Sequence, residues 1–399
     1  GVGGIARCGG RLGVDTVSAG INPANSLPVV LDFGTDNKKL LEDPFYLGVR
    51  KPRIRGAKYF EMVDAFIEAW AKRFPNALLQ WEDLSKSTAF EALARYRDKV
   101  PSFNDDIQGT GAMALAGLLA ATEQGKTLCE QVFLVSGAGA GGIGVAMQVR
   151  NGLVRLGLTP EEACKRIFVL DSRGLILDDR EGLEEYKVAF AHPRSDLADW
   201  EYASANPNLI ETIRNAKVTV LLGLSGQGGS FDQKVIEAVQ VNTAKPIVFA
   251  LSNPTNLTEI LPKDAICWTD GKVWMATGSP FSAVEWKGKT HEIGQGNNTF
   301  VFPGIGWGVA ASGARTVEAE MMTDASFALA AQVTPERLAT GAVFPKIADL
   351  MSVTDHVARA VAECAYRLGV ATVSHDVMEK RLAERDWVPS YTAYEYDPS

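Results

Sequence analysis

Short apolar runs alternate with amphipathic segments along most of the chain. Most of these runs show no polar alternation and are rich in Val, Leu, Ile and Phe, which is typical of parallel strands covered on both faces. They predict strands at 28–31, 77–80, 132–135, 167–170, 218–222, 247–251 and 273–277. Helical patterns predict helices at 57–74, 143–156, 160–165, 232–239, 318–332 and 354–368. The alternation predicts an α/β protein with two open, mainly parallel sheet domains.

A glycine-rich turn joins the strand predicted at 132–135 to the helix that follows it. Gly137, Gly139 and Gly142 have the spacing G-x-G-x-x-G, which between an apolar strand and an apolar helix indicates a Rossmann-type dinucleotide site. Gly137 allows the tight turn, Gly139 lets a pyrophosphate approach the backbone, and Gly142 lets the helix pack closely. The next predicted strand is followed by Asp171, where an acid is expected near the adenosine ribose.

The residues after that strand bear on the choice between NAD and NADP. Ser172 and Arg173 follow Asp171 directly, and Lys187 lies further along the chain. A ribose 2′-phosphate needs cationic and hydroxyl partners, so these side chains make NADP a candidate cofactor. The alternative interpretation is that Arg173 and Lys187 are surface charges, which leaves NAD.

Two adjacent acids, Asp105 and Asp106, stand at the entrance of a long apolar helix predicted at 111–121. Because neighbouring carboxylates repel, a divalent cation or a proton-transfer role would explain them; the alternative is one acid that caps the helix beside a solvated neighbour. Glu82 and Asp83 follow another predicted strand, and the ends of strands line ligand crevices in open α/β sheets. Together with Asp106 they would form the all-oxygen site that Mg²⁺ or Mn²⁺ prefers.

Composition and charge limit which binding partners and which cellular compartment are expected. A chain of 399 residues suggests two or three domains. The net charge of −8 and the pI of about 5.3 argue against nucleic acid and anionic membranes as partners, and no apolar run reaches membrane-spanning length. The five cysteines are scattered without paired spacing, so we expect a reducing compartment, either the cytoplasm or an organelle matrix.

Several segments, in order along nearly the whole chain, resemble those of malic enzymes and of the closely related malolactic enzymes. They are LDFGTDN at 31–37, DPFYLG at 43–48, QWED at 80–83, FNDDIQGT at 103–110, LSNPT at 251–255, ATGSPF at 276–281, GQGNN at 294–298 and FPG at 302–304.

The resemblance implies an enzyme that converts L-malate, or a similar 2-hydroxy acid, to pyruvate and CO₂ with NADP or NAD and with Mg²⁺ or Mn²⁺. By motif match, the metal ligands are Glu82, Asp83 and Asp106, and Asp105 supports the general base. Asn253 and either Asn297 or Asn298 then contact the substrate or the nicotinamide end of the cofactor. Ser172, Arg173 and Lys187 fall where relatives that use NADP carry similar residues. Relatives of this kind are commonly dimers or tetramers, so the resemblance also implies a homo-oligomer.

One departure from the family pattern concerns the general base. The family places a lysine in a Gly-Lys-Leu step, and here that step reads Gly10-Arg11-Leu12. Arginine stays protonated in proteins and cannot accept a proton at neutral pH, although it can hold a carboxylate or an oxyanion. Three interpretations follow: a malic-type enzyme with altered proton transfer, a malolactic-type enzyme that forms lactate, or an NAD(P)-binding homologue with impaired catalysis.

A second departure concerns the N-terminal side. The family's catalytic tyrosine and an arginine that grips the substrate carboxylate come from a region that precedes the segment matching Gly1, so we expect residues upstream of the sequence. We divide the chain into a substrate- and metal-side α/β domain at 1–104 together with 298–372, a Rossmann domain at 105–297, and a C-terminal helix and tail at 373–399.

Overall fold

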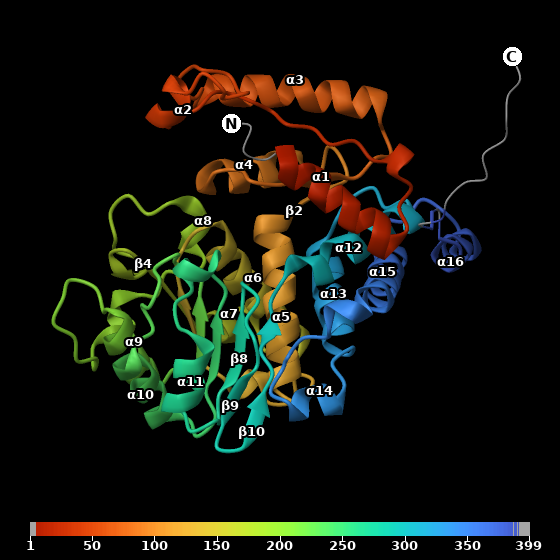
Figure 1. Cartoon of the computed structure of the whole chain (residues 1–399). Coiled ribbons are helices and arrows are strands. Elements are labelled where there is room, and N and C mark those ends of the chain that lie inside the picture. Colours follow the sequence, from red (N-terminus) through yellow and green to blue (C-terminus); the bar gives the residue numbers. More distant parts are fainter. Residues whose placement is uncertain (1–4, 386, 389, 391–399) are drawn as a thin grey trace, which may run out of the picture.

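The computed structural model describes residues 5–385, 387, 388 and 390. Its largest sheet has seven strands in the order β11-β8-β7-β6-β3-β4-β5 (Figure 1). All neighbours are parallel except β4 and β5. The strands are β3 (Phe133–Ser136), β4 (Ile167–Asp171), β5 (Gly174–Leu175), β6 (Val220–Gly223), β7 (Ile247–Ala250), β8 (Trp274–Thr277) and β11 (Gly294–Gln295).

Helices cover both faces of this sheet because successive strand side chains point to opposite sides. Phe133 and Val135 of β3 face one cluster, in which the core helices are α5 (Thr110–Ala121), α6 (Ala140–Arg155), α12 (Phe302–Ser312), α13 (Ala319–Ala330) and α15 (Leu350–Arg367). Leu134 faces the other cluster, with α9 (Leu209–Ala216), α10 (Gln233–Asn242) and α11 (Pro262–Trp268). This two-sided burial explains why the strands read as continuous apolar runs.

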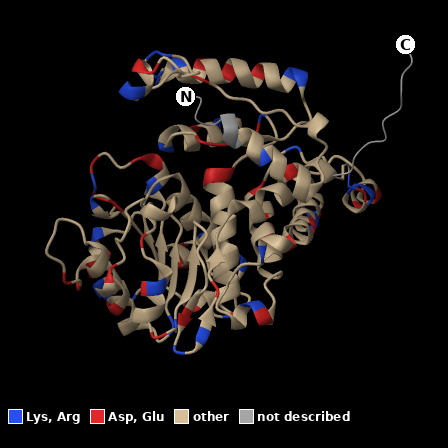
Figure 2. Cartoon of the chain, viewed as in Figure 1, with Lys and Arg blue, Asp and Glu red and all other residues tan. Residues whose placement is uncertain are grey.

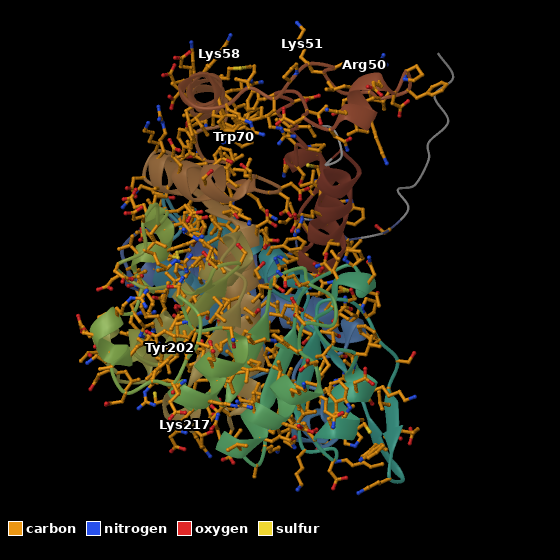
Figure 3. The ribbon with its side chains drawn as sticks, turned by 90° about the vertical axis from the view of Figure 1, so that its left-hand side faces the viewer. Arg50, Lys51, Lys58, Trp70, Tyr202 and Lys217 are labelled. Carbon is orange, nitrogen blue, oxygen red and sulfur yellow. The ribbon has the colours of Figure 1, made fainter. Side chains whose placement is uncertain are left out.

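An N-terminal layer lies over one end of the sheet domain (Figure 1). It contains a second sheet of two parallel strands, β1 (Leu79–Trp81) and β2 (Ser102–Asn104). Its helices are α1 (Ile5–Val14), α2 (Lys38–Glu42), α3 (Ala57–Arg73) and α4 (Lys86–Tyr96). Phe60, Ile67 and Trp70 of α3 pack with Trp81 and Tyr96 in a separate core. Figure 3 shows Trp70 within this layer and Lys51 and Lys58 on its outer side.

The remaining α-helices and strands are short or peripheral. They are α7 (Pro160–Cys164), α8 (Glu185–Val188), α14 (Pro335–Ala339), α16 (His375–Ala383) and the hairpin of β9 (Val284–Trp286) and β10 (Lys289–His291). None of the helices in the described part of the chain combines the length and apolar character that a membrane span requires. Figure 2 shows basic and acidic residues interspersed over the ribbon, with acidic residues at the end of α5 that meets the N-terminal layer.

The α/β fold class with mainly parallel sheets is confirmed, and six of the seven predicted strands overlap observed ones. The strand predicted at 28–31 is wrong: the segment forms no ladder, and the side chain of Val29 instead packs against the α3 core. The predicted C-terminal helix corresponds to α16, whereas the tail at 391–399 lies outside the described residues.

Candidate active site

A cavity of about 720 Å³ lies between the N-terminal layer and the carboxyl ends of the large parallel sheet. The N-terminal layer contributes polar side chains, the glycine-rich turn contributes backbone, and the loops after β6, β7 and β8 close the opposite wall. The lining includes Arg11, Glu82, Asp83, Lys86, Asp106, Thr110, Ala140, Gly141, Leu224, Leu251, Asn253, Gly278, Asn297, Asn298 and Phe302. Seven of the fifteen predicted site residues therefore line one space: Arg11, Glu82, Asp83, Asp106, Asn253, Asn297 and Asn298.

The two short parallel strands of the N-terminal layer place the central acids. Trp81 of β1 is in register with Asn104 of β2, so the residues that follow them, Glu82 and Asp105, emerge side by side. Arg11 bridges the pair: its Nη2 lies 2.5 Å from Glu82 Oε1 and its Nη1 lies 2.5 Å from Asp105 Oδ2. Burial alone would lower the pKa of Arg11, but the two carboxylates raise it above its ordinary value. Arg11 is therefore a fixed cation.

Asp105 is fully buried and held from several sides. Asn298 Nδ2 donates to Asp105 Oδ2 at 3.0 Å and also to Thr110 Oγ1 at 3.1 Å. Asp105 Oδ1 lies so close to Gly109 that a Cβ on that glycine would stand 1.9 Å from it. Burial raises the pKa of Asp105, while the Arg11 charge and the hydrogen bond from Asn298 oppose the shift. Asp105 and Arg11, the residue in the base position, therefore form an ion pair.

Glu82, Asp83 and Asp106 form the predicted trio of oxygen donors. One carboxylate oxygen from each lies within 4.8 Å of the others, and Asp106 Oδ2 accepts a hydrogen bond from the Asp83 backbone N–H at 2.8 Å. Glu82 Oε2 is buried and accepts no hydrogen bond from a described residue. Burial and the charges of Asp105 and Asp106 raise the pKa of Glu82 to about 8. A bound cation would give Glu82 Oε2 a partner and would reduce the repulsion among the three carboxylates, so the trio fits a divalent metal.

The glycine-rich turn has the backbone that its sequence predicts. Gly137 has a φ of 117°, and a Cβ there would stand 2.4 Å from the carbonyl oxygen of Leu224. A Cβ on Gly142 would stand 1.7 Å from the carbonyl oxygen of Gly137. Gly139 is the N-cap of α6, and among the described residues Lys86 Cε is the atom that approaches the place of a Cβ there, at 3.6 Å. The turn thus leaves open the approach that a pyrophosphate needs.

Asp171 lies at the end of β4, and its carboxylate already forms hydrogen bonds and ion pairs within the protein. Arg180 Nη2 donates to both oxygens at 2.9 and 2.7 Å, and Lys187 Nζ lies 3.2 Å from Oδ2. Burial would raise the pKa of Asp171, but the hydrogen bonds from Arg180 and its other donors keep it below the usual range. Lys187 is buried and also pairs with Glu184 at 2.8 Å. Sequence reasoning missed Arg180, which lies nine residues beyond Asp171 with no motif to mark it.

Ser172 and Arg173 are exposed beside this cluster. The backbone N–H of Arg173 donates to Asp171 at 2.9 Å, and its guanidinium reaches the carbonyl oxygen of Glu181 at 3.4 Å. Asn253 and Asn297 both line the cavity, and Asn297 Oδ1 accepts hydrogen bonds from Thr299.

Glu259 is a second residue that the sequence did not single out. It is fully buried and ties together the loops that follow β6 and β7. Its Oε1 accepts hydrogen bonds from the backbone N–H of Ser225 at 3.0 Å and from the hydroxyl of Ser252 at 2.5 Å. Because Leu224, Ser252 and Asn253 all line the cavity, this buried carboxylate positions one of its walls.

Two family models match consecutive parts of the chain. The family described as "Malic enzyme, NAD binding domain" matches residues 107–366, and "Malic enzyme, N-terminal domain" matches residues 1–97. Proteins named NAD-dependent malic enzyme from Erwinia tasmaniensis and Proteus mirabilis are each 43% identical over 396 residues, which is 99% of this chain and 70% of theirs.

Solved structures share the fold at lower sequence identity. The malic enzyme of Entamoeba histolytica has a TM-score of 0.71 at 24% identity and covers 96% of this chain and 70% of its own. The malic enzyme of Pyrococcus horikoshii Ot3 has a TM-score of 0.68 at 23% identity and covers 96% of this chain and 77% of its own.

Proposed function

We propose, because the chain belongs to the malic enzyme family, that it oxidises L-malate and decarboxylates it to pyruvate and CO₂ with NAD and a divalent cation. The observation that carries the proposal is the position of the acid trio Glu82, Asp83 and Asp106, which shares one cavity with the glycine-rich turn. A substrate held by the acids then lies within reach of a nicotinamide bound at the turn.

Glu82, Asp83 and Asp106 would hold Mg²⁺ or Mn²⁺ through carboxylate oxygens. A divalent cation bound there would polarise the substrate hydroxyl and the later keto oxygen. Asn253 and Asn297, on the other walls of the cavity, offer amide groups that can orient a carboxylate or the nicotinamide. Asn298 acts indirectly, since its amide is committed to Asp105 and Thr110.

We propose NAD rather than NADP as the cofactor. A 2′-phosphate would need cationic partners near the adenosine ribose; Lys187 is already paired with Asp171 and Glu184, and the Arg173 guanidinium donates to the carbonyl oxygen of Glu181. The carboxylate of Asp171 would also repel a phosphate at that place. The relatives from Erwinia tasmaniensis and Proteus mirabilis are named as NAD-dependent enzymes.

We expect the protein to turn over malate slowly because of Arg11. It occupies the step where the resemblance places a base lysine, and its guanidinium is locked between Glu82 and Asp105. It can hold these acids in place or donate to a developing oxyanion, but it cannot take the hydroxyl proton. The same pairing favours a second candidate, an NAD-binding homologue that no longer turns over malate.

A single assay separates the candidates. Purified protein with L-malate, NAD and Mn²⁺ is followed by nicotinamide absorbance, and pyruvate and lactate are quantified; Asp106→Asn serves as the control that loses a metal ligand. We expect Mn²⁺-dependent NADH formation with equal pyruvate, and no product from the control. Lactate without net NADH would indicate a malolactic-type enzyme. NADH binding without any product would indicate the impaired homologue.

A further inference from the structure

We propose that Lys86 is a cofactor-binding cation that reaches across the cavity from the N-terminal layer to the pyrophosphate of the dinucleotide. The assignment rests on the proposed use of NAD, and it adds a residue outside the Rossmann fingerprint. Lys86 is the first residue of α4, which belongs to the N-terminal layer and not to the sheet domain that carries the glycine-rich turn.

The position of Lys86 favours contact with the phosphates. Its side chain lines the cavity together with Ala140 and Gly141 of the turn. Its Cε lies 3.6 Å from the place that a Cβ on Gly139 would take. Since the pyrophosphate sits against this glycine in the Rossmann arrangement, the ammonium group at the end of Lys86 is within reach of it.

No acidic residue in the described part of the chain pairs with Lys86. The cations that line the cavity within the described residues are Arg11 and Lys86, and Arg11 is paired with Glu82 and Asp105. Lys86 forms no ion pair or hydrogen bond with a described residue. It also stands at the positive end of a helix whose first turn contains no acid, where a cation is unfavourable and an anionic ligand is stabilised.

Aromatic packing fixes α4 in this place. Phe90, one turn beyond Lys86, stacks on Tyr186 of the sheet domain with ring centroids 4.4 Å apart and an interplanar angle of 9°. Phe90 and Ala140 also pack against a buried cluster of Ala89, Leu93 and Ile107. The start of α4 is therefore held over the start of α6, whose own first turn contains no acid either.

The pyrophosphate is a better partner for Lys86 than the substrate carboxylate. The substrate is expected beside Glu82, Asp83 and Asp106, whereas Lys86 Cε lies 3.6 Å from the place that a Cβ on Gly139 would take. The pyrophosphate carries two negative charges at this turn, and the N-terminus of α6 supplies only partial charge. A full charge from Lys86 completes the site.

Titration of Lys86→Gln with NADH, without malate or metal, tests the assignment. We expect NADH to bind about tenfold more weakly than to the unmodified protein, and its affinity to depend less on salt, since one phosphate contact is lost. ADP-ribose, which retains the pyrophosphate, should show the same loss, and adenosine should show none. Lys86→Arg should restore most of the affinity because it keeps the charge.

Lys58→Gln is the matched control. Lys58 also lies exposed in the first turn of a helix, on the outer side of the N-terminal layer (Figure 3), so its loss should leave NADH binding unchanged. Unchanged NADH binding by Lys86→Gln would overturn the assignment, and a raised KM for malate in that case would place the cation at the substrate. An unmodified protein that binds NADH but forms no pyruvate would refute the proposed function alone. Failure to bind NADH would refute both.

Discussion

Replacement of Arg11 by lysine should convert a fixed cation into a proton acceptor. Arg11 uses two nitrogens, each 2.5 Å from a different carboxylate, and lysine has one nitrogen, so one of these contacts is lost. A buried amine can lose its proton near neutral pH, which a guanidinium cannot. Because a positioned general base contributes roughly 10²- to 10⁴-fold, Arg11→Lys should raise kcat by at least about 100-fold.

The assay measures kcat for NADH formation from L-malate as a function of pH. In Arg11→Lys the rate should rise with pH as the amine loses its proton. Arg11→Met is the control: it removes the charge without supplying a base, so its kcat should not exceed that of the unmodified protein. It should also lower the free energy of unfolding by about 3–5 kcal/mol, since it leaves the buried carboxylate of Asp105 without its cation. A kcat for Arg11→Lys no higher than that of the unmodified protein, with NADH binding intact, would refute the reasoning.

Three further predictions concern positions around the cavity. Gly109→Ala should lower the free energy of unfolding by about 1–3 kcal/mol and reduce kcat, because the new methyl group displaces Asp105; chemical denaturation and steady-state kinetics measure the two effects. Glu259→Gln removes the charged acceptor that joins two loops, so NADH should bind about tenfold more weakly, while equal binding in both proteins would exclude this positioning role. Burial and the charge of Asp105 raise the pKa of Asp15 to about 7; since the folded state then holds the proton more tightly, stability falls as pH rises through about 4 to 7. Asp15→Asn should therefore be more stable than the unmodified protein at about pH 8, by as much as about 4 kcal/mol, and the gain should shrink at about pH 4; urea denaturation at both pH values decides this.

The large sheet could be predicted from sequence because each strand is apolar on both faces, which leaves a continuous run. The strand predicted at 28–31 was wrong because an apolar run indicates burial but does not supply a partner strand, and Val29 is partly buried against the core of helix α3 instead. Helix α4 was missed although its buried residues, Ala89, Ala92, Leu93 and Tyr96, have the i, i+3, i+4, i+7 spacing of an amphipathic helix. Its position over the turn depends on a stacking contact between Phe90 and Tyr186, which are 96 positions apart in the sequence.

In the candidate site, too, local features could be predicted from the sequence, whereas contacts between distant residues could not. The glycine-rich turn is local, so its spacing was enough to predict its backbone. The pairing of Arg11 with Asp105 joins residues 94 positions apart, and only the family resemblance brought them together before the structure did. Arg180 and Glu259 carry no local pattern at all: each is buried, and each acts on groups that other parts of the chain supply.

The charges of the cavity divide into two ends that serve different ligands. At one end, the described residues include four acids, Glu82, Asp83, Asp105 and Asp106, and one cation, Arg11, which pairs with Glu82 and Asp105. At the other end, Lys86 and the N-terminus of α6 meet no acid in the first turns of their helices. A divalent cation is attracted to the first end and repelled from the second, and the reverse holds for a pyrophosphate. A bound cation therefore neutralises negative charge at the first end of the cavity, and a bound pyrophosphate neutralises positive charge at the second. We expect each ligand to strengthen the binding of the other, and we expect this coupling to weaken at high salt.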